Sequence, residues 1–145
     1  MDLNQLLRRL VLFSKTDEDR YIINQFILAL DNFLKKKDSL IASSKEGKSV
    51  ENNLAILIEM TVEPLNTNID YINFLVKDKE VNKIIREIKN IIKNIIKKLA
   101  KKNLADVNAM EKTLEKAIKK LTDESQKVYE RRLPKEEKKF IIEAS

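Results

Sequence analysis

The spacing of apolar residues along this chain predicts α-helices from end to end. Between short interruptions, apolar residues recur at three- and four-residue steps instead of alternating, which is the period of a helix. The interruptions are polar or contain proline, and they fall at 14–16, 43–48, Pro64, 77–78, 103–106 and Pro134. The pattern therefore predicts a short helix over 3–13 and longer helical segments over 17–42, 50–76, 79–102 and 106–133.

Local signals indicate where these helices begin and which faces they bury. Thr16 precedes the acids of 17–19 and is expected to cap a helix whose first turn favours negative charge. Asp78 is expected to cap the segment over 79–102. A broad stripe of isoleucines runs through that segment. Seven-residue steps predict two further buried stripes, made of Phe26, Phe33 and Leu40 and of Val107, Leu114, Leu121 and Val128.

The segment over 50–76 differs from the others. It contains no lysine or arginine, and its residues 54–62 are apolar on almost every side. A helix of that kind is normally enclosed by other helices, so we expect it in the middle of the assembly. Pro64 interrupts it, because proline removes an intrahelical hydrogen bond and clashes with the preceding turn. The sequence leaves open whether the helix kinks there or divides in two.

The lengths of the segments predict the fold class. Four of them contain about 25 residues and are therefore about 38 Å long, at a rise of 1.5 Å per residue. Such segments can bury wide apolar faces only against one another, as in an up-and-down bundle. We expect an all-α protein: an antiparallel four-helix-type bundle with short extra helices at both termini. We expect a single domain over residues 1–145, in which residues 134–145 form a short C-terminal helix or a tail that docks on a partner.

Composition argues against most catalytic chemistry. The chain has no histidine, no cysteine and one glycine, which removes the commonest general base, sulfur-ligated metal sites and phosphate-cradling loops. The acids Asp17, Glu18 and Asp19 are better explained as capping residues than as ligands of a hard cation. Glu111 and Glu115 lie one turn apart but lack the histidines of a di-iron bundle. We therefore expect a protein that is not an enzyme and holds no cofactor or metal.

The location of the protein is predicted from its N-terminus and its apolar stretches. Asp2 and the pair Arg8 and Arg9 are unlike a secretory signal peptide. The longest charge-free apolar stretch, Tyr21 to Leu30, has ten residues, whereas a membrane-spanning helix needs about 20. Together with the absence of cysteine, these features predict a cytoplasmic protein without a transmembrane segment.

Positive charge is concentrated in one helix. Residues 49–76 carry four acids and no cation, whereas residues 77–103 carry ten cations and three acids, so that the latter segment has a net charge of +7. We use the name basic ridge for the six cations opposite the isoleucine stripe, which are Lys83, Arg86, Lys89, Lys93, Lys97 and Lys101. Over the 18 residues from first to last, the ridge is about 27 Å long.

The basic ridge has three interpretations. It is the solvated face of an amphipathic helix, or it follows the phosphate backbone of a nucleic acid without reading its sequence. Stacking aromatic residues are missing from it, and Arg86 is its one guanidinium, which argues against base recognition. A membrane surface is the third interpretation, but the branched aliphatic side chains of this helix suit a protein core better.

The sequence supports two hypotheses of function. The first is a non-catalytic helical-bundle interaction or assembly subunit of a homo-oligomer or larger complex. Its C-terminal triplet Phe140, Ile141 and Ile142 would bind a groove on a partner or fold back onto its own bundle. The second is a backbone-directed, sequence-nonspecific nucleic-acid-binding protein that uses the basic helix over 79–102. No family resemblance favours one hypothesis over the other.

Overall fold

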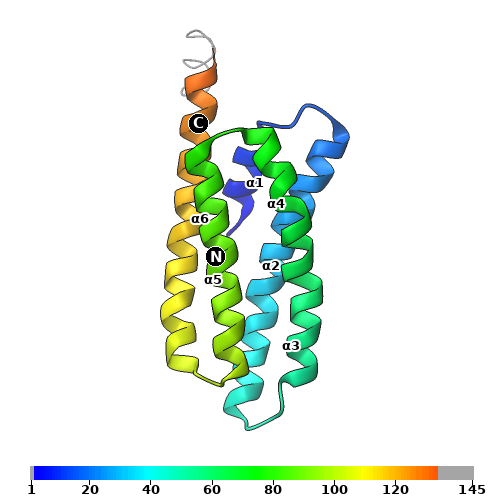
Figure 1. The fold of residues 1–145 in the computed structure, drawn as a ribbon, viewed down its shortest axis with the longest axis vertical. Helices are drawn as coiled ribbons and strands as arrows, with labels where there is room; N and C mark the ends of the chain where they lie inside the picture. Colours follow the sequence, from blue (N-terminus) through cyan, green and yellow to red (C-terminus); the bar gives the residue numbers. More distant parts are fainter. Residues whose placement is uncertain (1, 134–145) are drawn as a thin grey trace.

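The computed structural model of the protein describes residues 2–133, and these residues form helices without any strand (Figure 1). The all-helical prediction is confirmed. The predicted short helix over 134–145 lies outside the described residues. In chain order the helices are α1 (Asn4–Val11), α2 (Asp17–Lys45), α3 (Glu51–Leu57), the π-helical segment η1 (Ile58–Val62), α4 (Glu63–Val76), α5 (Lys79–Ala100) and α6 (Leu104–Arg132).

The predicted caps define the starts of two long helices. The hydroxyl of Thr16 accepts a hydrogen bond from the amide of Asp19, and the carboxylate of Asp19 accepts one in return from the amide of Thr16, which completes a capping box. The carboxylate of Asp78 accepts from the amide of Val81 at 3.0 Å. Helix α6 begins slightly earlier than predicted, because Asn103 caps it by accepting from the amide of Asp106.

Residues 51–76 form one continuous helical rod, which we call the α3–α4 rod. Pro64 does not divide the rod, because no non-helical residue separates α3, η1 and α4. The turn before the proline widens instead: the amide of Glu63 donates to the carbonyl of Ile58, five residues earlier. A π-helical turn of this kind absorbs one extra residue and relieves the backbone where proline cannot donate.

The core is built from the predicted apolar stripes. Phe26, Phe33 and the four heptad residues of α6 are at most 1% exposed, as are most members of the isoleucine stripe of α5. Helix α5 packs along α6, and α2 packs along η1 and α4, while the short α1 covers α6 and α2 near one end (Figure 1). None of the helices in the described part of the chain is long and apolar enough to span a bilayer.

The expectation that residues 54–62 lie in the middle of the assembly is wrong. The α3–α4 rod lies between α2 and α5 at the outside, and only one of its faces is buried, with Leu57 and Thr61 turned inward. Ile56, Ile58 and Met60 remain 46%, 36% and 42% exposed. The physical reason is competition for the interior, because the larger stripes of α2, α5 and α6 already fill the core of the single chain.

Candidate functional surfaces

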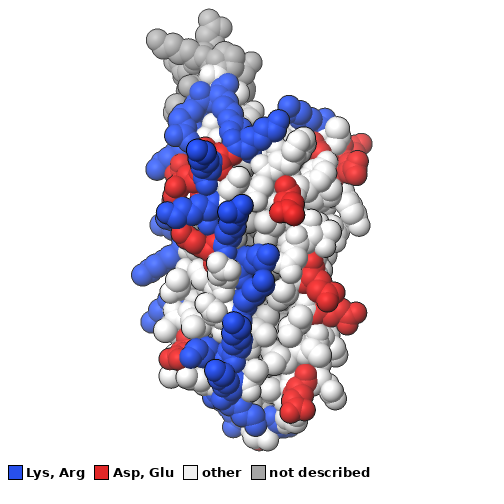
Figure 2. Space-filling model, viewed as in Figure 1, with Lys and Arg blue, Asp and Glu red and all other residues white. Residues whose placement is uncertain are grey.

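The basic ridge lies on the outer surface of α5 and ends at its C-cap residue Lys101. Lys89 is half-buried and the other five ridge cations are exposed, because the isoleucines of the opposite face hold α5 against its neighbours. Figure 2 shows lysine and arginine side chains in a continuous band along α5. Within residues 2–133, no ridge cation forms an ion pair. The prediction of a solvent-facing basic helix is therefore confirmed, whereas its function stays a prediction.

One end of the ridge borders a shallow depression. Its volume is about 490 Å³, and it is lined by Lys79, Asn82, Lys83, Arg86, Glu87 and Asn90. All of these residues belong to α5, so the depression lies along a single helix rather than between two. Three cations and one carboxylate give it a net positive charge.

A column of acids runs beside the basic ridge. We use the name acidic column for the exposed acids of the α3–α4 rod, which are Glu51, Glu59, Glu63 and Asp70. Figure 2 shows acidic side chains over the rod on the same face as the ridge, with uncharged surface between the two. No acid of the column forms an ion pair with any residue of 2–133. Sequence reasoning recorded the excess of acids here but missed the column, because it placed this segment in the interior.

The exposed apolar residues of the rod lie on its two flanks. Ile56 lines a depression of about 250 Å³ with Lys36 and Ser39 of α2, so it belongs to the flank that faces α2. Ile58 is two residues further along and therefore about 200° around the helix, on the flank that faces α5. This position puts Ile58 on the uncharged strip between the basic ridge and the acidic column.

The acids at the start of α2 have a structural role. Asp19 is 5% exposed and accepts hydrogen bonds from the hydroxyl of Tyr71 at 2.6 Å and from the amide of Lys15 at 2.8 Å. The Tyr71 bond is the main cause that lowers the pKa of Asp19 below its ordinary value, and the same bond raises the pKa of Tyr71 to about 12. Asp19 thus attaches α4 to the start of α2. Residues 2–133 contain no group of acids that could hold a metal ion.

A second polar contact joins α2 to α6. The ammonium of Lys37 is 2.5 Å from a carboxylate oxygen of Glu111 and 3.2 Å from one of Asp38. The side chain of Lys37 is 5% exposed, so its charge is held inside the protein by these two partners. Glu111 is therefore engaged as a counter-ion and does not pair with Glu115 in a metal site.

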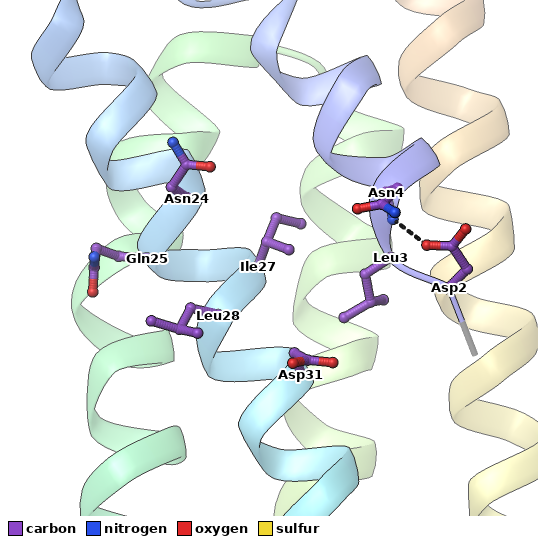
Figure 3. Close-up of a pocket in the computed structure, with 8 residues that line it drawn as sticks. All are labelled: Asp2, Leu3, Asn4, Asn24, Gln25, Ile27, Leu28 and Asp31. Carbon is purple, nitrogen blue, oxygen red and sulfur yellow. Dashed lines mark hydrogen bonds between the residues drawn. The ribbon is translucent and has the colours of Figure 1, made fainter.

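The depression between α1 and α2 is open and polar (Figure 3). Its volume is about 450 Å³, and its lining includes Asp2, Asn4, Asn24 and Asp31. In Figure 3, Leu3 and Ile27 project toward each other across the helix contact, whereas Gln25 and Leu28 project to the other side of α2. The carboxylate of Asp2 accepts from the amide of Asn4, and that of Asp31 pairs with Lys35. Both carboxylates of this depression therefore contact residues close to them in the sequence.

The predicted C-terminal contact residues Phe140, Ile141 and Ile142 lie outside the described residues. Comparison of the chain with protein-family models, with curated proteins and with solved structures gave no match. The surfaces of this chain are therefore what indicates its function. These surfaces are the basic ridge, the acidic column and the exposed flanks of the α3–α4 rod.

Proposed function

We propose that this protein is a non-catalytic assembly subunit that associates through the α3–α4 rod. The observation that supports the proposal is the exposure of Ile56, Ile58 and Met60, each more than a third exposed. A helix that is apolar on nearly all sides is typical of a central position, and in the single chain this helix lies at the outside. A partner that covers the rod would give it the environment its sequence favours.

A non-catalytic role agrees with the polar groups that the fold positions. Catalysis needs a nucleophile or an acid–base pair within reach of a bound substrate. The enclosed charged side chains Asp19 and Lys37 are instead in contact with Tyr71 and Glu111, and each contact joins helices distant in the sequence. We therefore propose no cofactor and no metal for this function.

The arrangement that presents the rod is, in this proposal, an antiparallel four-helix-type bundle. Its four rods are α2, the α3–α4 rod, α5 and α6, and α1 is the short extra helix. The connection between α4 and α5 has two residues, Lys77 and Asp78, which suits antiparallel neighbours. The contacts of α2 with α4 and of α5 with α6 support this order. The matching short helix within 134–145 remains a prediction.

The test is the concentration dependence of mass in sedimentation equilibrium. We expect the full chain to associate and the triple variant Ile56→Ser, Ile58→Ser, Met60→Ser to lose association while it keeps its helical circular dichroism. The double variant Tyr21→Ser, Leu28→Ser is the control and should still associate, since these residues are also exposed and apolar but lie on α2. A full chain that stays strictly monomeric at millimolar concentration contradicts the proposal.

A second candidate function is backbone-directed binding of nucleic acid by the basic ridge. It is favoured by one observation, which is that the ridge cations form no ion pair with the described residues 2–133 along a length of about 27 Å. Free cations release counter-ions from phosphates when they bind, so affinity should fall steeply with salt. With one guanidinium in the ridge, contacts would be made to phosphates and not to bases.

A salt-titrated binding assay on single- and double-stranded DNA and RNA tests this second candidate. Replacing Lys89, Lys93, Lys97 and Lys101 by glutamine should abolish binding. The control with the same change in net charge replaces Lys112, Lys116, Lys119 and Lys127, which are exposed on α6. Equal loss in both variants would indicate a response to total charge and would exclude the ridge as a specific surface.

A further inference from the structure

The basic ridge and the acidic column have similar lengths, and their charges lie at similar positions along the helix axes, which we call heights. Helices α4 and α5 are joined by Lys77 and Asp78, so residues equally far from this connection lie at similar heights. Asp70 is seven residues before Lys77, and Arg86 is eight residues after Asp78. The same count pairs Glu63 with Lys93 and Glu59 with Lys97. Nevertheless, none of these pairs forms an ion pair within residues 2–133.

We propose that the partner is a second copy of this chain, with the basic ridge of each copy placed against the acidic column of the other. The inference rests on the proposed assembly function and specifies its partner and geometry. It assigns the dimer face to α5 and the outer face of the α3–α4 rod; Figure 2 shows a band of cations along α5 and separate acids over the rod.

Symmetry determines how two such faces fit together. A twofold axis parallel to the helices exchanges the two sides of the face and leaves heights unchanged, so each ridge meets a column at matching height. An axis across the helices would place ridge against ridge, and like charges would repel. The parallel arrangement brings Lys93 opposite Glu63 of the second copy and Lys97 opposite Glu59. Every such pair occurs twice in the dimer.

Two apolar side chains lie at the centre of this face. The twofold axis passes through the uncharged strip, where Ile58 is 36% exposed and Val62 is partly buried. Helix α5 has 22 residues and is therefore about 33 Å long, and two helices side by side are about 20 Å wide. The face thus measures about 660 Å², close to the roughly 800 Å² that each partner contributes to a specific interface.

Charge reversal tests the proposal in the full chain. The ridge-reversed variant is Lys93→Glu, Lys97→Glu, and the column-reversed variant is Glu59→Lys, Glu63→Lys. We expect each alone to weaken self-association at least about tenfold in sedimentation equilibrium, because attractive pairs become repulsive. An equimolar mixture of the two variants should associate again as a heterodimer. The control Lys116→Glu, Lys119→Glu, which lies on α6, should leave association unchanged.

Cross-linking tests the position of the axis. The chain has no cysteine, so Ile58→Cys introduces a unique thiol near the axis and Ile56→Cys introduces one on the other flank of the rod. A short bismaleimide should join two copies of the first variant efficiently and of the second poorly. Equal cross-linking of both variants would overturn the proposed axis.

The outcomes separate this inference from the proposals above. If both reversed variants associate like the unmodified chain but the Ile56, Ile58 and Met60 serine variant does not, assembly through the rod stands and the ridge-on-column dimer is wrong. If ridge reversal abolishes nucleic-acid binding and column reversal leaves self-association intact, the ridge serves a polyanion and the dimer is again wrong. Restoration of association in the mixture supports the dimer, because nucleic-acid binding does not predict it.

Discussion

The enclosed charge of Lys37 provides a quantitative test of how α2 and α6 are held together. Its ammonium has two carboxylate partners, Glu111 on α6 and Asp38 on its own helix. The side chains of Glu111 and Asp38 are 26% and 73% exposed, against 5% for Lys37. The three groups therefore differ in how readily each can return to water when its partner is removed.

This difference in exposure predicts an asymmetry between two single variants. Breaking a buried pair by removing one partner costs about 3–5 kcal/mol. Glu111→Leu leaves the Lys37 ammonium enclosed with Asp38 alone, so we expect a cost of about 2–3 kcal/mol. Lys37→Met leaves Glu111 with a quarter of its surface already in water, so the cost should be about 1 kcal/mol or less. The double variant should resemble Lys37→Met, which gives a coupling energy of about 2 kcal/mol.

Urea unfolding of the four proteins in the cycle, followed by circular dichroism, measures these differences. For a chain of this length, about 2 kcal/mol corresponds to a decrease in Tm of about 7 °C. Glu115→Leu is the control, because Glu115 is exposed one turn from Glu111 on the same helix and should change stability by less than about 0.5 kcal/mol. If Glu111→Leu costs no more than this control, the enclosed ion pair does not join the two helices as described.

Three further predictions concern other contacts of the fold. The Asp19–Tyr71 hydrogen bond should make stability depend on pH at both extremes. Its contribution should be lost below about pH 4, as the pH falls through the lowered pKa of Asp19. It should also be lost between pH 10 and about 12, as the pH rises through the raised pKa of Tyr71. Tyr71→Phe should remove the alkaline loss, and ultraviolet titration should show that the most basic of the three tyrosines is missing. Leu114→Ala, at a fully buried heptad position, should cost about 2–5 kcal/mol in urea unfolding, whereas Lys112→Ala should cost less than about 0.5 kcal/mol. The last prediction compares two single-residue deletions in a Pro64→Ala background. Deletion of Glu59 should be tolerated, because it converts the π turn to an ordinary α turn. Deletion of Asn66 should unfold much of α4, because it rotates the buried Ile69 away from the face that carries Leu57. Thermal unfolding followed by circular dichroism compares the two deletion variants. If both lose helical signal equally on heating, η1 holds no extra residue.

The parts of the structure that sequence predicts are those set by neighbours along the chain. The cap at Thr16 depends on residues three positions away, and the heptad stripe through Leu114 depends on a period within one helix. Both were therefore predictable. The bond between Asp19 and Tyr71 joins residues 52 positions apart, and no local pattern distinguishes Tyr71 from the other tyrosines. Contacts of this kind require the tertiary structure.

The functional surfaces were predictable to a different degree. The basic ridge follows from the positions of lysines opposite an isoleucine stripe, and the structure places it where that pattern requires. The acidic column required knowledge of which segment lies beside α5, and this depends on how the helices share the interior. The composition of 54–62 indicated a central helix, which is wrong for the single chain, because only Leu57 and Thr61 of this segment are buried.

The apolar composition of 54–62 agrees with a central position if the centre is that of a dimer and not of one chain. A surface helix without lysine or arginine keeps its exposed face free of long cationic side chains, which leaves room for the lysines of another α5. The exposed Ile58 lies on the strip where a twofold axis would bury it. The rod and α5 carry opposite net charges, but no ion pair joins them within the described residues. These charges therefore form no close contact within one chain, whereas they would be complementary between two copies. The features that contradict the prediction of a central rod are therefore the features that favour self-association through it.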